Sequence, residues 1–116
     1  MEIVRPWKLF AAAMMRALPS AIHTRRLDVR DDRECSAFVA WAHDKMQGLN
    51  CLINNAGVIR DGLLVKKDRK TGEVKKMSSD DWKMVIDVNL HGAAYMVRES
   101  VAKMLETDTR PAVIVN

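Results

Sequence analysis

Cysteine is scarce in this 116-residue chain, with Cys35 and Cys51 as its only two residues of that type. Neither lies at a short paired spacing, so the sequence excludes a disulfide framework and a cysteine-rich zinc site. No apolar run approaches the roughly 20 residues that a membrane-spanning helix requires. The amino-terminal segment is only weakly typical of a secretion signal, because Arg16 interrupts its apolar stretch. We therefore expect a cytoplasmic protein that does not cross a membrane.

Glycine and proline are also few, at five and three residues, which excludes collagen-like and low-complexity chains. The chain is 48% apolar and 29% charged, the composition of a packed globular protein. Its length allows one small domain and leaves little room for a second. We expect a single unit over residues 1–116.

Aromatic residues are absent from residues 60–76, a segment that holds seven bases against three acids. This excess of four accounts for the whole formal net charge of +4. Without aromatic side chains the segment cannot stack on bases, so we expect no nucleic-acid partner. The sequence predicts a basic surface loop or hairpin over residues 60–77, turning at Thr71 and Gly72. The alternative is a patch that attracts an anionic substrate carrier or a phosphate.

Hydrophobic periodicity predicts helices that alternate with strands. Asp31 and Asp32 suit the start of the second helix, and Gly48 suits a left-handed cap at its end. Ser78 to Asp81 forms a capping-box pattern ahead of the third helix. The predicted helices cover residues 7–18, 32–47 and 79–106, and the predicted strands cover residues 21–29, 49–53 and 112–115. This order predicts an α/β fold with a parallel sheet, in which strand 49–53 is covered on both sides.

One polar residue interrupts the apolar stripe of the third predicted helix. Asn89 occupies a position that the helical spacing assigns to the buried face, and Gly92 weakens the same region. A buried amide without partners costs about 1–3 kcal/mol. Such a local conflict indicates a functional residue. The alternative is that Asn89 only ties down a neighbouring loop.

Three short motifs give the chain a resemblance to a known family. They are Leu27-Asp28-Val29 at the end of a strand, Asn54-Asn55-Ala56-Gly57 after the next strand, and Val88-Asn89-Leu90 in the long helix. In order and separation they are similar to the short-chain dehydrogenases/reductases, over about residues 8–116. The stretch from Gly57 to Leu64 resembles members that reduce 3-oxoacyl thioesters on acyl carrier protein.

The resemblance implies an oxidoreductase that uses NAD or NADP to reduce a carbonyl or oxidise an alcohol. It implies that Asp28 accepts a hydrogen bond from the adenine amino group and that Val29 packs beside the ring. It places the adenosine part of the cofactor against Asn55, Ala56 and Gly57. Asn89 would be an auxiliary catalytic residue that holds a water linked to the catalytic lysine.

The chain also departs from the family pattern. It has no glycine-rich turn for a pyrophosphate, and its only tyrosine, Tyr95, is followed four residues later by Glu99 instead of lysine. The resemblance therefore implies a partial Rossmann-like sheet, with elements like the family's strands three, four and five and without the first. We expect strand 21–27 to dock beside strand 49–53, to remain loose, or to find a partner chain. We expect a fragment that is inactive alone.

The expected partners follow from the same resemblance. The whole enzyme would bind a small-molecule or acyl-thioester substrate, and helix 79–106 could form a homo-oligomer contact. The alternative function is a non-catalytic interaction module that binds a full-length relative through that helix. A zinc site remains disfavoured, because His23, Cys35, His43 and Cys51 lack the short paired spacings of structural zinc ligands, so we expect no metal.

Overall fold

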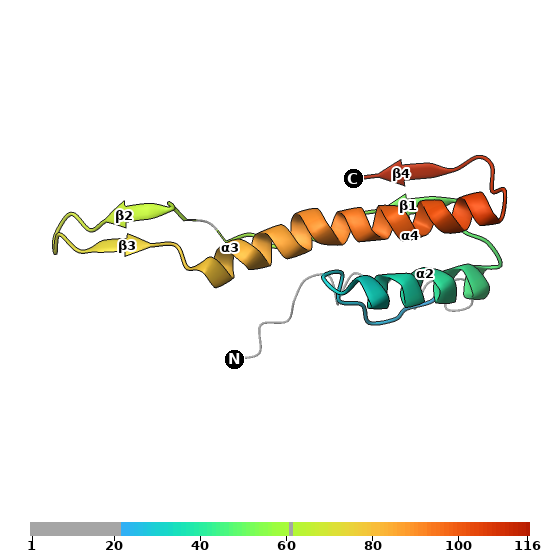
Figure 1. Ribbon diagram of the computed structural model, residues 1–116, viewed down its shortest axis with the longest axis horizontal. Coiled ribbons are helices and arrows are strands. Elements are labelled where there is room, and N and C mark those ends of the chain that lie inside the picture. The colour runs from blue at the N-terminus through green and yellow to red at the C-terminus, as the bar shows by residue number, and fades with distance from the viewer. Residues whose placement is uncertain (1–21, 61) are drawn as a thin grey trace.

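The computed structural model describes residues 22–60 and 62–116, and the predicted helix 7–18 lies outside them. Helices pack beside a short parallel strand pair, which confirms the α/β fold class (Figure 1). A hairpin and a π-helical segment complete the described part. The elements are α2 (Asp32–Met46), β1 (Cys51–Ile53), β2 (Val65–Lys67), β3 (Val74–Lys76), α3 (Ser79–Ile86), η1 (Asp87–Gly92), α4 (Ala93–Glu106) and β4 (Val113–Val115).

Helix α2 begins and ends on recognisable caps. The Asp31 carboxylate accepts from the backbone N–H groups of Arg33 and Glu34, as the acidic start predicts. The helix ends at Met46, one residue before the predicted end, so Gln47 takes the left-handed position with φ of 55°. The prediction that Gly48 is the left-handed cap is therefore wrong. Gly48 instead donates its backbone N–H to the His43 carbonyl, at 3.0 Å.

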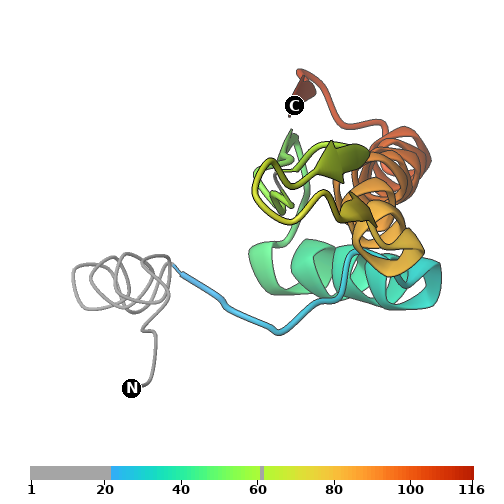
Figure 2. The same cartoon turned by 90° about the vertical axis from the view of Figure 1, so that its left-hand side faces the viewer.

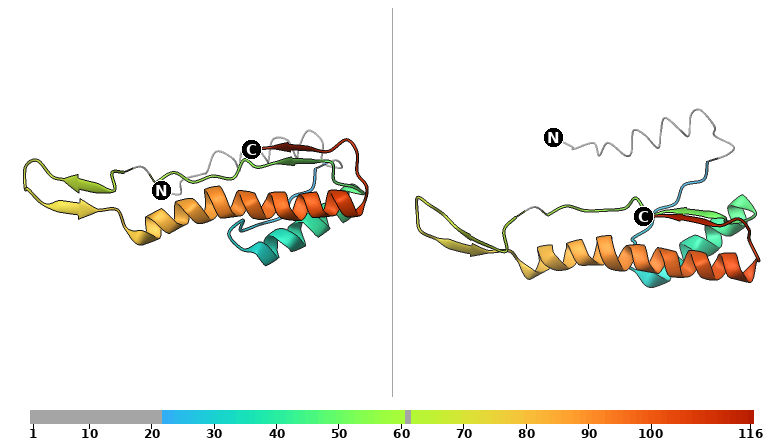
Figure 3. Two further views of the ribbon diagram at one scale, coloured as in Figure 1. Left: turned by 45° about the horizontal axis from the view of Figure 1, so that its top comes forward. Right: turned by 90° about the horizontal axis from the view of Figure 1, so that it is seen from above.

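The parallel sheet contains two strands, with β1 paired to β4 and Leu52 opposite Ile114. Only Leu52 is buried in β1, while Ile53 is 67% exposed and all three residues of β4 are exposed. The prediction of a strand covered on both sides is therefore wrong. Helix α4 runs along the strand pair and contacts β1 (Figure 3). Among the described residues, the other side chains of the two strands remain exposed.

The predicted strand 21–29 is not a strand in the described residues, 22 onward. Its end is a turn, in which the Asp31 backbone N–H bonds the Asp28 carbonyl at 3.1 Å. A β-strand needs a neighbouring strand for its backbone groups, and residues 22–29 pair with none of the described strands. Leu27 and Val29 still pack against the core. Of the three expected outcomes for this segment, the described part follows the one without strand pairing.

The core lies between α2, α4 and β1 (Figure 2). Burial raises the pKa of the Cys35 thiol above its ordinary value, which keeps the thiol protonated. The buried residues that form this core cluster are Cys35, Val39, Leu49, Leu52, Met96 and Met104. Along residues 22–60 and 62–116, no helix has the length and apolarity to cross a membrane.

The third predicted helix is present but not uniform. Its Ser78 cap is confirmed, because the Ser78 hydroxyl accepts from the Asp81 N–H at 3.0 Å and donates to the Asp81 carboxylate at 2.7 Å. Residues 87–92 then form a π-helical segment between α3 and α4. Such wide turns inside a helix occur frequently at functional sites. This segment is where the sequence motifs meet.

Candidate functional site

The Asn89 side chain binds the backbone of a single loop residue. Its Oδ1 atom accepts from the Val58 N–H and its Nδ2 atom donates to the Val58 carbonyl, both at 2.9 Å. Asn89 is exposed, so the prediction of an amide on the buried face is wrong. The wide π turns depart from the uniform 3.6-residue spacing on which that prediction rested. The loop-tying alternative describes the contacts that Asn89 makes.

Gly57 lies directly beside this amide. A Cβ atom added to Gly57 would be 3.6 Å from Asn89 Oδ1, which is ordinary van der Waals contact. The Asn-Asn-Ala-Gly corner and the helix motif therefore share one place in the fold, on facing segments. Asn55 and Ala56 are exposed between this contact and the end of β1.

Asn54 anchors the other end of the corner. Its backbone N–H bonds the Val115 carbonyl at 2.8 Å, and its side-chain Nδ2 donates to Asn116 Oδ1 at 2.7 Å. The same Nδ2 lies 3.4 Å from the Ala93 carbonyl. The sequence motif includes Asn54, but the family resemblance assigns cofactor contacts only to Asn55, Ala56 and Gly57. The position of Asn54 directly after a strand, with two amides in succession, was the available signal.

Val29, the last residue of the Leu27-Asp28-Val29 motif, packs against Gly92 of the π-helical segment. A Cβ atom on Gly92 would lie 2.7 Å from Val29 Cγ2 and 3.1 Å from the Val29 carbonyl oxygen, so only glycine fits there without a shift. The Val29 carbonyl also accepts from the buried Cys35 thiol at 3.4 Å. Gly92 therefore permits close packing against Val29. From the sequence, Gly92 could be recognised only as a residue that weakens the helix.

The three motifs converge on residues 89–93. Gly57 and Val58 meet Asn89, Val29 meets Gly92, and Asn54 meets the Ala93 carbonyl. Segments far apart in the sequence are therefore held against one short stretch of helix. This arrangement fixes the two loops that follow residue 28 and residue 54 relative to each other.

Asp28 presents an ionised carboxylate at this end of the fold. Its side chain is paired with Arg30, whose Nη2 lies 2.6 Å from Oδ2 and whose Nε lies 2.9 Å from Oδ1. The Arg30 side-chain hydrogen bonds, followed by the Arg30 backbone N–H, lower the pKa of Asp28 to about 2. The carboxyl group is 38% exposed, so it can accept from a ligand as well as from Arg30.

An open hollow beside Asp28 has an excess of negative charge. Its lining holds four carboxylates and two guanidinium groups. This charge favours a ligand that donates hydrogen bonds from an amino group and repels a phosphate. The hollow is lined by Asp28, Arg30, Asp31, Asp32, Arg33 and Asp87. Within the described ranges, this hollow included, no group of three or more His, Cys, Asp and Glu residues is placed to hold a metal ion.

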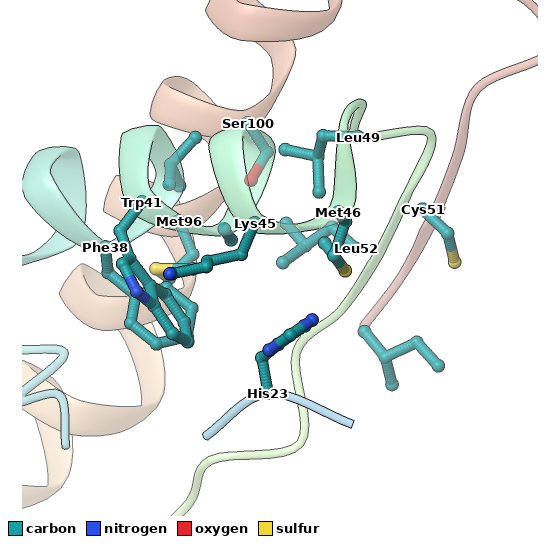
Figure 4. Close-up of a pocket in the computed structure, with 13 residues that line it drawn as sticks. His23, Phe38, Trp41, Lys45, Met46, Leu49, Cys51, Leu52, Met96 and Ser100 are labelled. Carbon is teal, nitrogen blue, oxygen red and sulfur yellow. The ribbon is translucent and has the colours of Figure 1, made fainter. Parts of the chain in front are cut away.

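A second, apolar hollow of about 200 Å³ lies between α2 and β1 (Figure 4). The buried Ser100 hydroxyl points into it and has no hydrogen-bond partner within the described residues. Lys45 and His23 contribute its polar groups. None of the predicted site residues lines this hollow, so it is separate from the motif cluster.

The only tyrosine lies beside an arginine of its own helix. Tyr95 packs against the core, with the Arg98 guanidinium 5.3 Å from its ring centroid. Glu99, four residues later, pairs with Arg98 at 2.8 Å.

Comparisons with known proteins cover most of the chain. Residues 8–116 match the family model for short chain dehydrogenase. The 3-oxoacyl-[acyl-carrier-protein] reductase FabG of Buchnera aphidicola is 30% identical over 81 residues, which are 70% of this chain and 29% of that protein. The FabG of Thermotoga maritima is 32% identical over 89 residues, which are 77% of this chain and 32% of that protein. The chain spans less than a third of the length of these relatives.

Solved structures also resemble most of this chain. The ligand-free aldohexose dehydrogenase of Thermoplasma acidophilum superimposes with a TM-score of 0.60 at 27% identity, covering 77% of this chain and 30% of that one. The structure of ElxO with NADP bound gives a TM-score of 0.70 over 94% of this chain and 40% of that one. At 23% identity, that likeness shows the fold alone. Because the family model covers nearly every residue, this chain belongs to the short chain dehydrogenase family.

Proposed function

We propose that this chain forms the adenosine-facing part of an NAD(P)-dependent oxidoreductase. The whole enzyme would move a hydride between the nicotinamide and a carbonyl or hydroxyl carbon. Two relatives named as 3-oxoacyl-[acyl-carrier-protein] reductases favour a 3-oxoacyl thioester as the substrate class. The observation that carries the proposal is the convergence of three family motifs on residues 89–93.

The residues present fit the adenine end of such a cofactor. The Asp28 carboxylate is ionised and partly exposed, so it can accept from the adenine amino group, with Val29 beside the ring. Asn55, Ala56 and Gly57 form an exposed edge for the adenosine. The phosphates find no comparable site, because this chain has no glycine-rich turn and the hollow at Asp28 is acidic.

Asn89 serves this site as a positioning residue. Both polar groups of its side chain are used on Val58, which directly follows the Asn55-Ala56-Gly57 edge. The amide therefore fixes the loop that would face the adenosine. In the whole enzyme the same residue would keep the auxiliary catalytic role that the family resemblance implies.

Titration of the isotope-labelled chain with adenosine tests the proposal by amide chemical shifts. We expect the shifts to concentrate at residues 28–29 and 55–58. Asp28→Asn removes the ionised acceptor and should weaken binding by about ten-fold. The control Asp44→Asn removes the same charge at the far end of α2 and should bind as the parent does. Shifts confined to other residues, or equal binding by Asp28→Asn, would contradict the proposal.

We further propose that the 116-residue chain alone has no turnover. Its only tyrosine lacks the lysine four residues later, and proton exchange with the substrate depends on that pair in the family. Steady oxidation of NADPH with an acetoacetyl thioester, by the purified chain, would overturn this expectation.

A non-catalytic interaction module is the second candidate function. The helical run from α3 to α4 exposes Trp82 by 53%, Leu90 by 59% and Leu105 by 74%. Large apolar side chains that remain open to solvent are typical of protein contacts. This function requires a cooperatively melting chain that forms a stable complex with a full-length relative. Size-exclusion chromatography of the mixture distinguishes it from a chain that binds nothing.

A further inference from the structure

The hairpin formed by β2 and β3 projects past the end of α3 (Figures 1 and 3). All residues of both strands are exposed, so no core supports them. A two-stranded hairpin of this kind is marginally stable in water. Its turn is nevertheless well formed, because the Asp68 carboxylate accepts from the N–H groups of Lys70 and Thr71 at 2.8 and 2.9 Å.

The pairing of the strands places like charges together. Lys66 lies directly opposite Lys75 in the antiparallel ladder. Like charges at such positions are destabilising. Residues 62–77 hold six bases and two acids. One of the acids, Glu73, forms a weak ion pair with Lys75 at 3.4 Å. Repulsion between these lysines destabilises the folded hairpin, so an anionic partner that binds them would stabilise it.

The hairpin and the residues that lead into it also expose large apolar side chains. Each is more than half exposed: Ile59 75%, Leu63 69%, Leu64 62%, Val65 57% and Val74 56%. At the base of the hairpin, Leu63 and Met77 share a hollow with Lys66, Lys75 and Lys76. Apolar side chains within a ring of charge are the usual composition of a protein interface. We call Leu63, Leu64, Lys66, Val74, Lys75 and Lys76 the hairpin surface.

We propose that the hairpin surface docks an acidic protein. Its partner would present apolar side chains to Leu63 and Leu64 and carboxylates to the surrounding lysines. Charge complementarity of this kind raises the association rate and fixes orientation. The hollow at the base of the hairpin shares no lining residue with the acidic hollow at Asp28, so this proposal does not depend on the cofactor proposal.

Other occupants fit this surface less well. A small anion would need an enclosed site, and these side chains are exposed. A nucleic acid would meet no aromatic side chain between residues 60 and 76, and Asp81 adds a carboxylate to the lining of the hollow. A membrane surface would find polar residues at the tip, from Asp68 to Gly72, where an apolar anchor is needed.

Fluorescence anisotropy with a labelled short peptide of alternating glutamate and leucine tests the proposal. We expect the full chain to bind this peptide, and to lose affinity as salt rises to about 0.5 M, because surface charges are screened. A DNA duplex of matched charge and phosphatidylserine vesicles are the competing probes. Tighter binding of either one, or no peptide binding at low salt, would overturn the proposal.

Paired variants locate the contact. Lys66→Gln with Lys75→Gln removes the repelling cross-strand pair, so the hairpin should remain folded while peptide affinity falls by about five-fold. The control pair, Arg33→Gln with Lys83→Gln, removes the same charge from exposed helical positions. Equal losses in the two pairs would show only a net-charge effect and would refute a docking surface.

A third variant separates the apolar part from the charges. Leu63→Ser with Leu64→Ser changes two exposed side chains, so the fold should be kept. We expect weaker peptide binding at both low and high salt, since apolar contacts are not screened. Amide chemical shifts of the bound chain should move between residues 63 and 76, and shifts confined to other regions would contradict the assignment.

Discussion

At the scale of single residues, the Asn89 side-chain amide forms two hydrogen bonds with the Val58 backbone, accepting from its N–H and donating to its carbonyl. Replacement by alanine removes two hydrogen bonds at an exposed position. We predict that Asn89→Ala lowers the free energy of unfolding by about 1 kcal/mol and speeds hydrogen exchange at the Val58 amide. Urea unfolding and exchange measured by NMR check both effects.

The neighbouring amide gives a matched control. Asn55 is exposed, and its replacement by alanine should leave the unfolding free energy and the Val58 exchange rate unchanged. An unchanged Val58 exchange rate in Asn89→Ala would mean that the two hydrogen bonds do not hold the loop. The loss should therefore be specific to residue 89.

Asp28 carries the most clearly shifted carboxyl group of the candidate site. Arg30 lowers its pKa from 3.8 to about 2. A carboxyl group with a lowered folded-state pKa stabilises the fold above its unfolded pKa, and the contribution is lost as pH falls toward 2. We predict an NMR titration midpoint near 2 for Asp28, and Arg30→Gln should move that midpoint upward toward 3.8. A midpoint unaffected by Arg30→Gln would show that the ion pair is not the cause.

At the scale of elements, the π-helical segment depends on a glycine that the neighbouring turn approaches closely. Alanine is the better helix former, by about 1 kcal/mol, so helix propensity alone favours Gly92→Ala. The added Cβ would lie 2.7 Å from Val29 Cγ2 and 2.9 Å from Val29 Cβ, which forces the two segments apart. Overpacking of this kind costs about 1–3 kcal/mol, so we predict a lower melting temperature.

Gly57→Ala is the matched control for this packing. Its Cβ would meet Asn89 Oδ1 at 3.6 Å, an ordinary contact, so its melting temperature should stay close to that of the parent chain. Thermal unfolding followed by circular dichroism compares the two variants. A Gly92→Ala chain as stable as the parent would mean that the Val29 turn can yield without cost.

At the scale of the whole molecule, local signals predicted more than long-range ones. Helix α2, the Ser78 cap, strand β1 and the turn at Thr71 and Gly72 follow from spacing and caps, and the structure confirms them. Whether residues 21–29 pair as a strand could not be predicted, because pairing depends on which other segment of the chain lies beside them. The π-helical segment and the close packing of Val29 against Gly92 within it could not be predicted either, because hydrophobic periodicity assumes a uniform helix and records no contact between distant segments.

The residues of the candidate site also divide into those that the sequence identifies and those that it does not. Asp28, Gly57 and Asn89 could be identified by motif, and the structure gathers their segments around one stretch of helix. Their assigned roles toward a cofactor remain predictions. The partners that hold them, Arg30 and the Val58 backbone, could not be identified from spacing, since hydrogen bonds to a loop backbone leave no pattern of residue types.

The two-stranded sheet leaves apolar strand residues open, with Ile53 67% and Val113 51% exposed. Open apolar strands promote pairing between chains. We therefore predict that the chain self-associates as its concentration rises, which light scattering over a concentration series will detect. Ile53→Lys should reduce this association without lowering the melting temperature, because its side chain does not contribute to the core.

Leu105→Lys supplies the comparison, since Leu105 is 74% exposed on α4 and does not belong to a strand. If strand pairing causes the association, this variant should associate as the parent does. Equal suppression by both variants would instead indicate a general effect of added positive charge. Suppression by Leu105→Lys alone would assign the contact to the helix, in agreement with the interaction-module alternative and against strand pairing.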